Sequence, residues 1–318
     1  MGVFKIFKKK RSITLATKKN GLVGRIPVAT RVYNNKEELY LSVASIIQNE
    51  GSYLEEWIEF HRLAGFEHFI LYDNNSTDNT VEILQKYIQS NIVTLIPWPN
   101  FCVTHSLQML AYSHAVTHMA GRTRWLSFID LDEFLFPTET DDLRAALVEF
   151  ESEPAVGVYW SLFGTSGLKS KPRGLVIENY TWRLPYLMER HTTPEQERLR
   201  KKIGLSEFKS IVQPTRIIST KGAHSFITDR FPVLAVDGSW NEIQLHTKRF
   251  LFVEKFQLNH YISKSQEEWN NRLERRDVEG VDKRKQKQRM LDAIETDPVE
   301  DTGILKYLPK LKKIIGNT

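Results

Sequence analysis

The chain has 318 residues, 41% of them hydrophobic, which is enough for one large globular domain or two small ones. Its net charge of +5 and pI of about 9.0 fit a nucleic acid, a phosphorylated small molecule or an anionic membrane as partner, without choosing among them. The single cysteine, Cys102, excludes an internal disulfide framework and a cysteine-based zinc site, and no apolar run approaches the roughly 20 residues of a membrane span.

Residues 1–36 form a basic leader without a regular pattern, which we expect to be flexible. Basic side chains stand beside Phe4, Ile6 and Phe7 there, and lysines recur among the Ile and Leu residues of 304–318. Such ends suit peripheral contact with an anionic lipid surface, although frayed, solvated ends have the same composition. Because the leader has no secretory signal, we expect a cytoplasmic protein, at the inner face of the plasma membrane if its ends touch lipid.

From residue 39 onward, apolar runs alternate with helical patterns. Gly65 suits the end of the first helix, and Asp78 suits the start of the second. The alternation predicts right-handed crossovers and a largely parallel sheet covered by helices on both faces. In chain order, the predicted elements are a strand at 39–49, a helix at 52–65, a strand at 66–74, a helix at 78–90, a strand at 91–98, a helix at 105–121 and a strand at 124–134.

Polar side chains follow three of these strands. Asn49 and Glu50 end the first strand, Asp73 ends the second, and Asp130 and Asp132 lie at the end of the fourth. In open sheets of this kind, ligands bind beyond the carboxyl ends of the strands. We therefore expect these polar groups to meet at one edge of the sheet.

The acidic residues of SFIDLDEFLFP, at 127–137, interrupt an apolar run. In an extended strand Asp130 and Asp132 would share a face, and two neighbouring carboxylates repel each other unless a cation or a proton intervenes. Mg²⁺ and Mn²⁺ prefer such oxygen ligands together with substrate phosphates, so we interpret the pair as a metal clamp for a diphosphate. The competing interpretation is a capped turn with solvated acids. Glu133 either orients the pair or is a surface acid.

Five ordered blocks give the chain a resemblance to a known family. NEGSYLEEWIEFHRLAGFEHFILYDNNSTDNT (49–80), WLSFIDLDEFLFP (125–137), YWSLFGTSG (159–167), FKSIVQPTRI (208–217) and NHYISKSQEEW (259–269) resemble glycosyltransferase family 92 and bacterial relatives near glycosyltransferase family 2.

The resemblance implies an α/β fold of the GT-A type, with a mostly parallel central sheet flanked by helices. It also implies an inverting transfer of a sugar, with a lean towards galactose, from a nucleotide-diphosphate donor such as a UDP-sugar to a glycan acceptor, with Mn²⁺ or Mg²⁺. We expect this GT-A domain at 37–270, followed by a charged helical tail at 271–318. A bacterial enzyme of surface-polysaccharide synthesis fits this picture.

The same resemblance assigns donor-binding roles. Asp132 would bind the metal, and Asp130 would contact the metal or the ribose. Asp73 would contact the base or ribose, and Asn49 and Glu50 would contact the base. Each of the last three also suits a plain turn.

Two histidines are candidate third ligands of the metal. His260 follows an apolar, strand-like run, and Lys264 just beyond it could hold the leaving diphosphate. His224 is the alternative, and either ring could instead be structural. Gly164 would let the backbone approach the donor or acceptor closely.

Inversion requires a carboxylate that takes the proton of the acceptor hydroxyl. Asp237 has Trp240 nearby to stack on an acceptor sugar, although an Asp-Gly turn explains the residue as well. The sequence leaves four carboxylates open for this role: Glu207, Asp229, Asp237 and Glu242.

Two other functions compete with sugar transfer. A nucleic-acid-binding protein would explain the basic pI, but the chain has no motif for reading a groove, so we expect no nucleic-acid partner. A nucleotidyltransferase or other phosphate-processing enzyme could use the same two aspartates. It would carry a Gly-rich, basic loop after the first strand, where this chain has IIQNEGSYLEEW.

Overall fold

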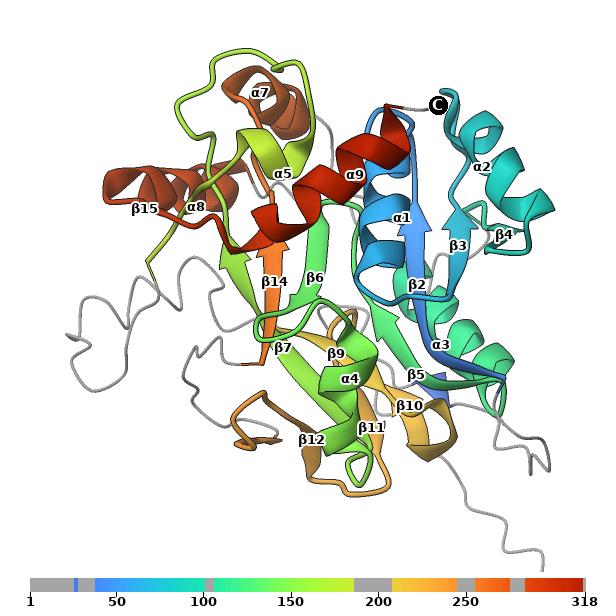
Figure 1. The fold of residues 1–318 in the computed structure, drawn as a ribbon. Helices are drawn as coiled ribbons and strands as arrows, with labels where there is room; N and C mark the ends of the chain where they lie inside the picture. The colour runs from blue at the N-terminus through green and yellow to red at the C-terminus, as the bar shows by residue number, and fades with distance from the viewer. Residues whose placement is uncertain are drawn as a thin grey trace, which may run out of the picture.

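The computed structural model describes residues 26–27, 38–100, 106–185, 208–244, 255–274 and 284–316 (Figure 1). Of the predicted leader, only the short strand β1 (Ile26–Pro27) belongs to the described residues. Glu207, one of the proposed catalytic carboxylates, lies outside them.

The first half of the domain follows the predicted alternation closely. Gly65 has a φ of +108° just after the first helix, which is the left-handed conformation expected of a glycine at a helix end. The elements are β2 (Leu39–Ile47), α1 (Leu54–Leu63), β3 (His68–Asp73), α2 (Thr80–Gln89), β4 (Val93–Pro97), α3 (Leu107–Met119) and β5 (Thr123–Phe128).

The strand predicted at 124–134 was wrong in its second half. β5 ends at Phe128, a turn carries Asp130 and Asp132, and β6 (Glu133–Pro137) begins directly after it. The Glu133 backbone N–H donates to the Asp130 carbonyl at 3.0 Å, and the Asp130 N–H donates to Glu133 Oε2 at 2.8 Å. These two bonds close the turn, so the aspartates are not alternate residues of one strand.

One mixed sheet organises the domain, in the order β13-β12-β7-β9-β5-β2-β3-β4, with β14 paired to β7 and to β6. β2, β3, β4, β5, β7, β12 and β14 run in one direction, and β6, β9 and β13 run in the other. The predicted α/β class, with a mostly parallel sheet flanked by helices, is confirmed. The strands not yet bounded are β7 (Ala155–Leu162), β9 (Phe208–Val212), β12 (Val233–Val236), β13 (Glu242–Gln244) and β14 (Phe256–His260).

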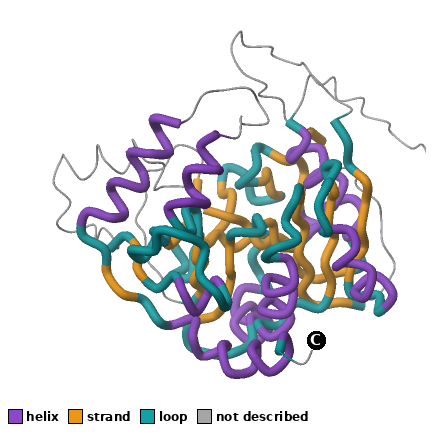
Figure 2. The backbone as a smooth tube through the Cα atoms, turned by 90° about the horizontal axis from the view of Figure 1, so that it is seen from above, coloured by secondary structure: helices purple, strands orange, loops and turns teal. Residues whose placement is uncertain are grey.

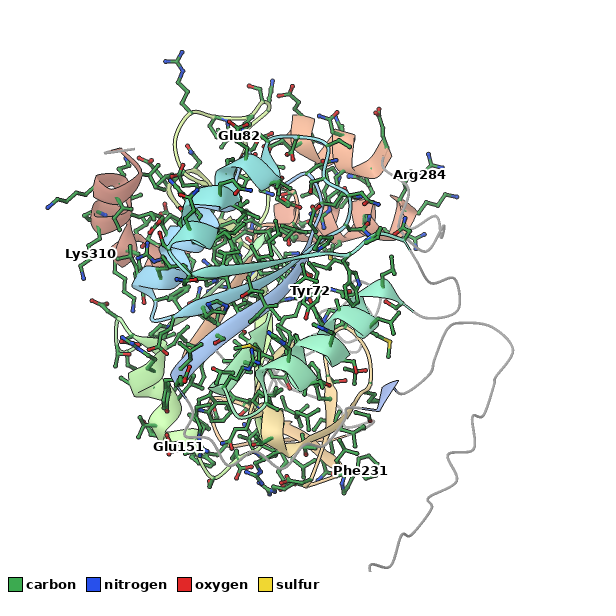
Figure 3. The ribbon with its side chains drawn as sticks, turned by 90° about the vertical axis from the view of Figure 1, so that its right-hand side faces the viewer. Tyr72, Glu82, Glu151, Phe231, Arg284 and Lys310 are labelled. Atoms are coloured by element: carbon green, nitrogen blue, oxygen red, sulfur yellow. The ribbon has the colours of Figure 1, made fainter. Side chains whose placement is uncertain are left out.

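Helices cover both faces of this sheet, as the view from above shows (Figure 2). α1 packs on one face with η4 (Gly303–Tyr307) and the C-terminal α9 (Leu308–Ile315): the rings of Phe60 in α1 and Tyr307 in η4 lie 5.0 Å apart, and Leu311 of α9 belongs to the same core. α3 packs on the other face, together with buried side chains of α7 and α8 such as Trp269 and Ile294. Figure 3 shows Tyr72 inside the molecule and Lys310 on its outside.

Smaller elements complete the described chain. β10 pairs with β1 and β11 in a separate sheet, and β15 pairs with β8. No helix in the described ranges is long and apolar enough to cross a bilayer. The remaining bounds are α4 (Leu143–Leu147), η1 (Val148–Phe150), α5 (Val176–Asn179), β8 (Trp182–Arg183), η3 (Pro214–Arg216), β10 (Ile217–Thr220), β11 (Phe226–Thr228), α7 (Gln266–Glu274), α8 (Arg284–Thr296), β15 (Val299–Glu300), η4 (Gly303–Tyr307) and α9 (Leu308–Ile315).

Candidate active site

The candidate site lies at the edge where β5, β7 and β14 end. His260, the last residue of β14, pairs with Glu133 at the start of β6 and with Leu162 at the end of β7. The turn that carries Asp130 and Asp132 therefore stands beside the end of β14. α7 and α5 lie above this end of β14 (Figure 1).

Asp130 is held by three donors from the protein. Lys209 Nζ, on β9, lies 2.7 Å from Asp130 Oδ2, while Gln108 Nε2 and the Tyr112 hydroxyl approach Oδ1 at 3.2 and 3.5 Å. Burial alone would raise the pKa of Asp130, but the Lys209 ammonium outweighs it and the pKa lies below its usual value. Asp130 is therefore a fixed carboxylate with a buried counter-cation.

Glu133 shares the same cation. Its side chain is fully buried, and Oε2 lies 3.5 Å from Lys209 Nζ. Burial raises the pKa of Glu133 to about 7, even though the Lys209 charge opposes this shift. Its Oε1 has no hydrogen-bond partner among the described residues. Glu133 is therefore a buried residue that hydrogen-bonds to the turn. The alternative interpretation, a surface acid, was wrong.

Asp132 faces a different pair of groups. Its Oδ2 accepts a hydrogen bond from Arg272 Nη1 on α7 at 2.6 Å and lies 3.5 Å from His260 Nε2. Burial would raise the pKa of Asp132, but Arg272 and then His260 hold it well below its usual value. The His260 ring packs on Trp160, with 4.6 Å between centroids, and its Nδ1 is buried with no hydrogen-bond partner in the described ranges.

The residues present fit a divalent cation with two protein ligands. Asp132 Oδ2 and His260 Nε2 are 3.5 Å apart, close to the spacing of about 3 Å between neighbouring ligands of a six-coordinate Mg²⁺. The described residues contain no cluster of three or more His, Cys, Asp or Glu side chains suited to a metal. A site of one or two carboxylates completed by phosphate oxygens and water is typical of Mg²⁺ and Mn²⁺, so the Asp132 carboxylate suits either ion, whereas the His260 imidazole is a softer ligand than Mg²⁺ prefers.

His224 lies in the same buried region but faces other groups. Its ring is 5.3 Å from that of Trp160, and its Nδ1 has no hydrogen-bond partner within the described ranges. Burial and then the nearby Lys209 charge lower the pKa of His224 to about 3, so the ring is neutral. The geometry brings His260 to Asp132 and leaves His224 on the Lys209 side.

The residues predicted to contact the nucleoside hold loops at the ends of β2 and β3. Asn49 Oδ1 accepts from the backbone N–H groups of Thr77 and Asp78 at 2.7 and 3.3 Å, and Asp73 Oδ1 accepts from the Ser76 N–H at 3.1 Å. These contacts order both loops at the carboxyl edge of the sheet.

Glu50 connects that edge to α7 by charge. Its backbone N–H donates to the Thr80 hydroxyl at 2.8 Å. Burial would lower the pKa of Arg272, but Asp132 and, less strongly, Glu50 raise it. Glu50, in the loop after β2, therefore adds a negative charge near Arg272.

Gly164 and Lys264 follow β7 and β14. A Cβ on Gly164 would lie 2.4 Å from Glu295 Oε1, so the close approach at this glycine is to α8. Lys264 has a φ of +52°, rare for a residue with a side chain, and its Nζ lies 4.3 Å from the centre of the Tyr53 ring. Burial raises the pKa of Asp132, and the Lys264 charge helps Arg272 and His260 to lower it, less strongly than either of them.

Asp237, one of the proposed bases, lies away from this site. Asp237 Oδ1 accepts from the backbone N–H groups of Ser239 and Asn241, both at 2.9 Å, and so closes the turn between β12 and β13. Gly238, in the same turn, lies against Lys255 just before the start of β14. His260 is at the other end of β14, and a five-residue strand is about 16 Å long. Asp237 is therefore at the opposite end of β14 from His260.

The remaining candidate bases are bound to arginines. Glu242 pairs with Arg230 at 3.1 Å and is 43% exposed. Asp229 pairs with Arg216 at 2.8 Å. The structure therefore does not bring Asp237 or Glu242 together with the aspartate turn, and the Asp229 carboxylate already has a partner.

Sequence reasoning did not single out Lys209 or Arg272. Lys209 is a lone charge in the apolar strand FKSIV, and that lone charge was the available signal. Arg272 is the one basic residue of α7, and in the sequence it belongs to the charged segment 263–290, whose basic residues all suit solvent, so no local pattern separates it from the others.

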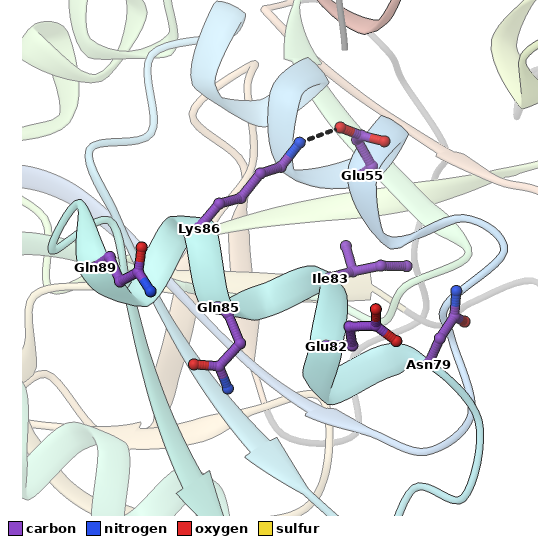
Figure 4. Close-up of a pocket in the computed structure, with 7 residues that line it drawn as sticks. All are labelled: Glu55, Asn79, Glu82, Ile83, Gln85, Lys86 and Gln89. Atoms are coloured by element: carbon purple, nitrogen blue, oxygen red, sulfur yellow. Dashed lines mark hydrogen bonds and ion pairs between the residues drawn. The ribbon is translucent and has the colours of Figure 1, made fainter.

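A surface hollow of about 460 Å³ lies between α1 and α2, next to the ion pair of Lys86 and Glu55 (Figure 4). None of its lining residues belongs to the site described above, and we assign it no function. They are Glu55, Asn79, Glu82, Ile83, Gln85, Lys86 and Gln89.

The chain is similar in sequence to curated plant proteins whose family is known. It is 28% identical over 192 residues to a glycosyltransferase family 92 protein of Ricinus communis, covering 54% of this chain and 32% of that protein. It is 31% identical over 155 residues to a family 92 protein of Oryza sativa subsp. japonica, covering 48% and 26%. The chain spans between about a quarter and a third of the length of these curated relatives. Both are plant proteins, so the bacterial setting stays a prediction.

Two solved structures show partial likeness to the chain. TarS of S. aureus, in complex with UDP-GlcNAc, has a TM-score of 0.36 and 14% identity, covering 88% of this chain and 80% of that one. Glucosyl-3-phosphoglycerate synthase of Mycobacterium tuberculosis, in complex with Mn²⁺, UDP and glucosyl-3-phosphoglycerate, has a TM-score of 0.30 and 16% identity, covering 57% and 58%.

A family model also matches the chain. The description of that model is glycosyltransferase family 92, and it matches residues 37–295. This range contains the whole candidate site, from Asn49 to Arg272. Because the match covers most of the chain, this protein belongs to glycosyltransferase family 92.

Proposed function

We propose that this chain transfers a sugar, with inversion, from a UDP-sugar to a glycan acceptor, and that the reaction depends on a divalent metal. The observation that carries the proposal is the pairing of Asp132 Oδ2 with His260 Nε2, 3.5 Å apart at the carboxyl edge of the sheet, in a chain of this family. Lys264 and Arg272 add positive charge at the same edge. Such a cluster suits a diphosphate.

The protein groups around the donor have separate tasks. Asp132 and His260 would hold Mn²⁺ or Mg²⁺, and that ion would neutralise charge on the leaving diphosphate. Lys209 already holds the Asp130 side chain in place. The remaining lone pairs of its oxygens could therefore accept a hydrogen bond from a ribose hydroxyl at no further cost in ordering the side chain. Lys264 and Arg272 would bind diphosphate oxygens as charge builds on them.

The nucleoside would lie over the ends of β2 and β3. Asn49, Glu50 and Asp73 are our candidates to contact its base and ribose. The bonds that Asn49 and Asp73 make to the loop at 76–78 support this role, because they order the backbone on which a nucleoside would rest. Gly164 remains a candidate for the wall of the sugar pocket.

The general base is best sought at the same edge. Inversion needs a carboxylate on the acceptor side of the sugar. β9 begins with Phe208 at the carboxyl edge, because it runs antiparallel to β5, and Glu207 directly precedes it in the sequence. We therefore propose Glu207 ahead of Asp237 and Glu242 as the base.

The cell setting and the sugar are further proposals. We propose galactose as the sugar because of the resemblance noted in the sequence. The basic residues at both ends remain our reason to propose peripheral contact with an anionic membrane at its cytoplasmic face, and surface-polysaccharide synthesis as the setting.

Calorimetric titration with UDP, UDP-galactose and UDP-glucose, with and without Mn²⁺, tests the donor and the metal together. We expect UDP-sugar binding that strengthens with Mn²⁺ in the wild type and loses this dependence in Asp132→Asn. Nucleotide binding that ignores Mn²⁺ in both proteins would contradict the metal assignment. Incubation with nucleoside triphosphates and sugar phosphates serves as the control, since pyrophosphate release there would favour a nucleotidyltransferase.

A further inference from the structure

One oxygen of Asp132 lies between a permanent cation and an imidazole. Asp132 Oδ2 is 2.6 Å from Arg272 Nη1 and 3.5 Å from His260 Nε2. The same Nη1 also donates to the Ile262 carbonyl at 3.2 Å, which directs the guanidinium to this point. Arg272 therefore stands against the oxygen that the proposed metal would use.

A guanidinium and a divalent ion cannot use this oxygen equally well at once. Both are positive, and in a site where Asp132 is only 12% exposed their repulsion is weakly screened. A metal that approaches Asp132 and His260 must therefore displace Arg272 or bind weakly.

The Arg272 side chain can move to another position, whereas the Lys209 side chain is enclosed. The Arg272 side chain is 38% exposed and starts from α7, at the rim of the site. Lys209 is 2% exposed and lies between two carboxylates. A diphosphate offers a guanidinium two oxygens in the geometry that it binds best, so the donor can replace Asp132 as the partner of Arg272.

We propose that Arg272 occupies the metal position in the donor-free protein and moves from Asp132 to the donor diphosphate when donor and metal bind together. This inference rests on the proposed metal-dependent sugar transfer. It makes Arg272 a positioning residue that couples the two ligands, so that metal binds weakly alone and tightly with nucleotide.

Electron paramagnetic resonance of Mn²⁺ bound to the full chain tests the proposal without measuring transfer. Without nucleotide, Arg272→Gln should bind Mn²⁺ at least about tenfold more tightly than the wild type, within the range of known couplings between sites. Saturating UDP should strengthen Mn²⁺ binding in the wild type much more than in the variant. Arg272→Lys keeps the positive charge but loses the planar guanidinium, so its Mn²⁺ affinity should lie between those of the wild type and Arg272→Gln.

Matched controls separate the possible failures. Arg144→Gln removes an arginine that is 43% exposed and paired with Asp142 far from the site, and it should bind Mn²⁺ as the wild type does. If Asp132→Asn abolishes Mn²⁺ binding while Arg272→Gln leaves it unchanged, the metal site stands and the role of Arg272 is overturned. If Asp132→Asn binds Mn²⁺ as the wild type does, the proposed metal site itself is overturned, and this inference with it. A melting curve for each variant confirms that a folded protein is compared.

Discussion

Replacing Lys209 by methionine should destabilise the fold strongly. The ammonium is 2% exposed and lies 2.7 Å from Asp130 Oδ2 and 3.5 Å from Glu133 Oε2. Methionine fills a similar volume but leaves these two carboxylates without their shared cation. Removing one partner of a buried ion pair costs about 3–5 kcal/mol, because the other charge stays buried and unpaired.

Urea unfolding at pH 7 measures this loss. Lys255→Met is the matched control, since Lys255 pairs with Glu149, which is 52% exposed, and such surface pairs are worth about 0–1 kcal/mol. The deficit of Lys209→Met should shrink as the pH falls. In the wild type the pKa of Asp130 is lowered, so its contribution is present at neutral pH and lost in acid, whereas in the variant protonation relieves the unpaired carboxylates.

A second substitution locates the cause of the loss. The pKa of Glu133 is already about 7 beside Lys209, so Glu133 takes up a proton when that charge is lost. Asp130→Asn in the Lys209→Met background therefore removes the remaining stranded charge and should recover part of the free energy of unfolding. The coupling between the two sites is then read from a double-mutant cycle. A Lys209→Met protein as stable as Lys255→Met, within about 1 kcal/mol, would refute the view that this buried charge network holds the turn.

Three further predictions follow from single sites. Asp132→Asn should lower the rate of sugar transfer by about 10²-fold or more while the melting temperature changes little, as an activity assay and a thermal melt would show, because its partner Arg272 can turn to solvent. Burial raises the pKa of Glu56 from 4.5 to about 7, so the stability that this group contributes is full below pH 4.5 and lost as the pH rises to 7. Glu56→Gln should therefore make the free energy of unfolding less dependent on pH between 4.5 and 7, by at most about 3 kcal/mol, as unfolding measured at several pH values would show. Gly164→Ala should cost about 1–3 kcal/mol in chemical unfolding, because its Cβ would lie 2.4 Å from Glu295 Oε1 and 2.9 Å from Ile294 Cγ2; an unchanged midpoint would contradict the close packing of α8 there.

The sequence predicted the first half of the fold well because its signals are local. Leu54, Trp57 and Ile58 recur at helical spacing and are all fully buried in α1, and Gly65 ends that helix as its freedom at positive φ predicts. The turn at the aspartates was not predicted. The alternation of IDLDEF fits a strand, but two hydrogen bonds between Glu133 and Asp130, one from the Glu133 backbone N–H and one to its side chain, form a turn there instead.

The site was predicted only in part for a related reason. Asp130, Asp132 and His260 belong to short blocks whose chemistry is visible in the sequence. Their partners are distant along the chain: Lys209 lies 79 residues from Asp130, and Arg272 lies 140 residues from Asp132. A pairing over such a separation is decided by the packing of β9 and α7 onto the sheet, and no local pattern contains it.

The two aspartates of one turn therefore differ in a way that their spacing conceals. The cation beside Asp130 is buried and fixed, whereas the cation beside Asp132 is partly exposed and can leave. Asp130→Asn should consequently lower the free energy of unfolding, since Lys209 would keep only Glu133, whose pKa should then fall. Asp132→Asn should instead act on metal binding and transfer. Urea unfolding of both variants, beside Mn²⁺ titrations, measures the contrast, and equal losses of stability would show that the turn responds as one unit.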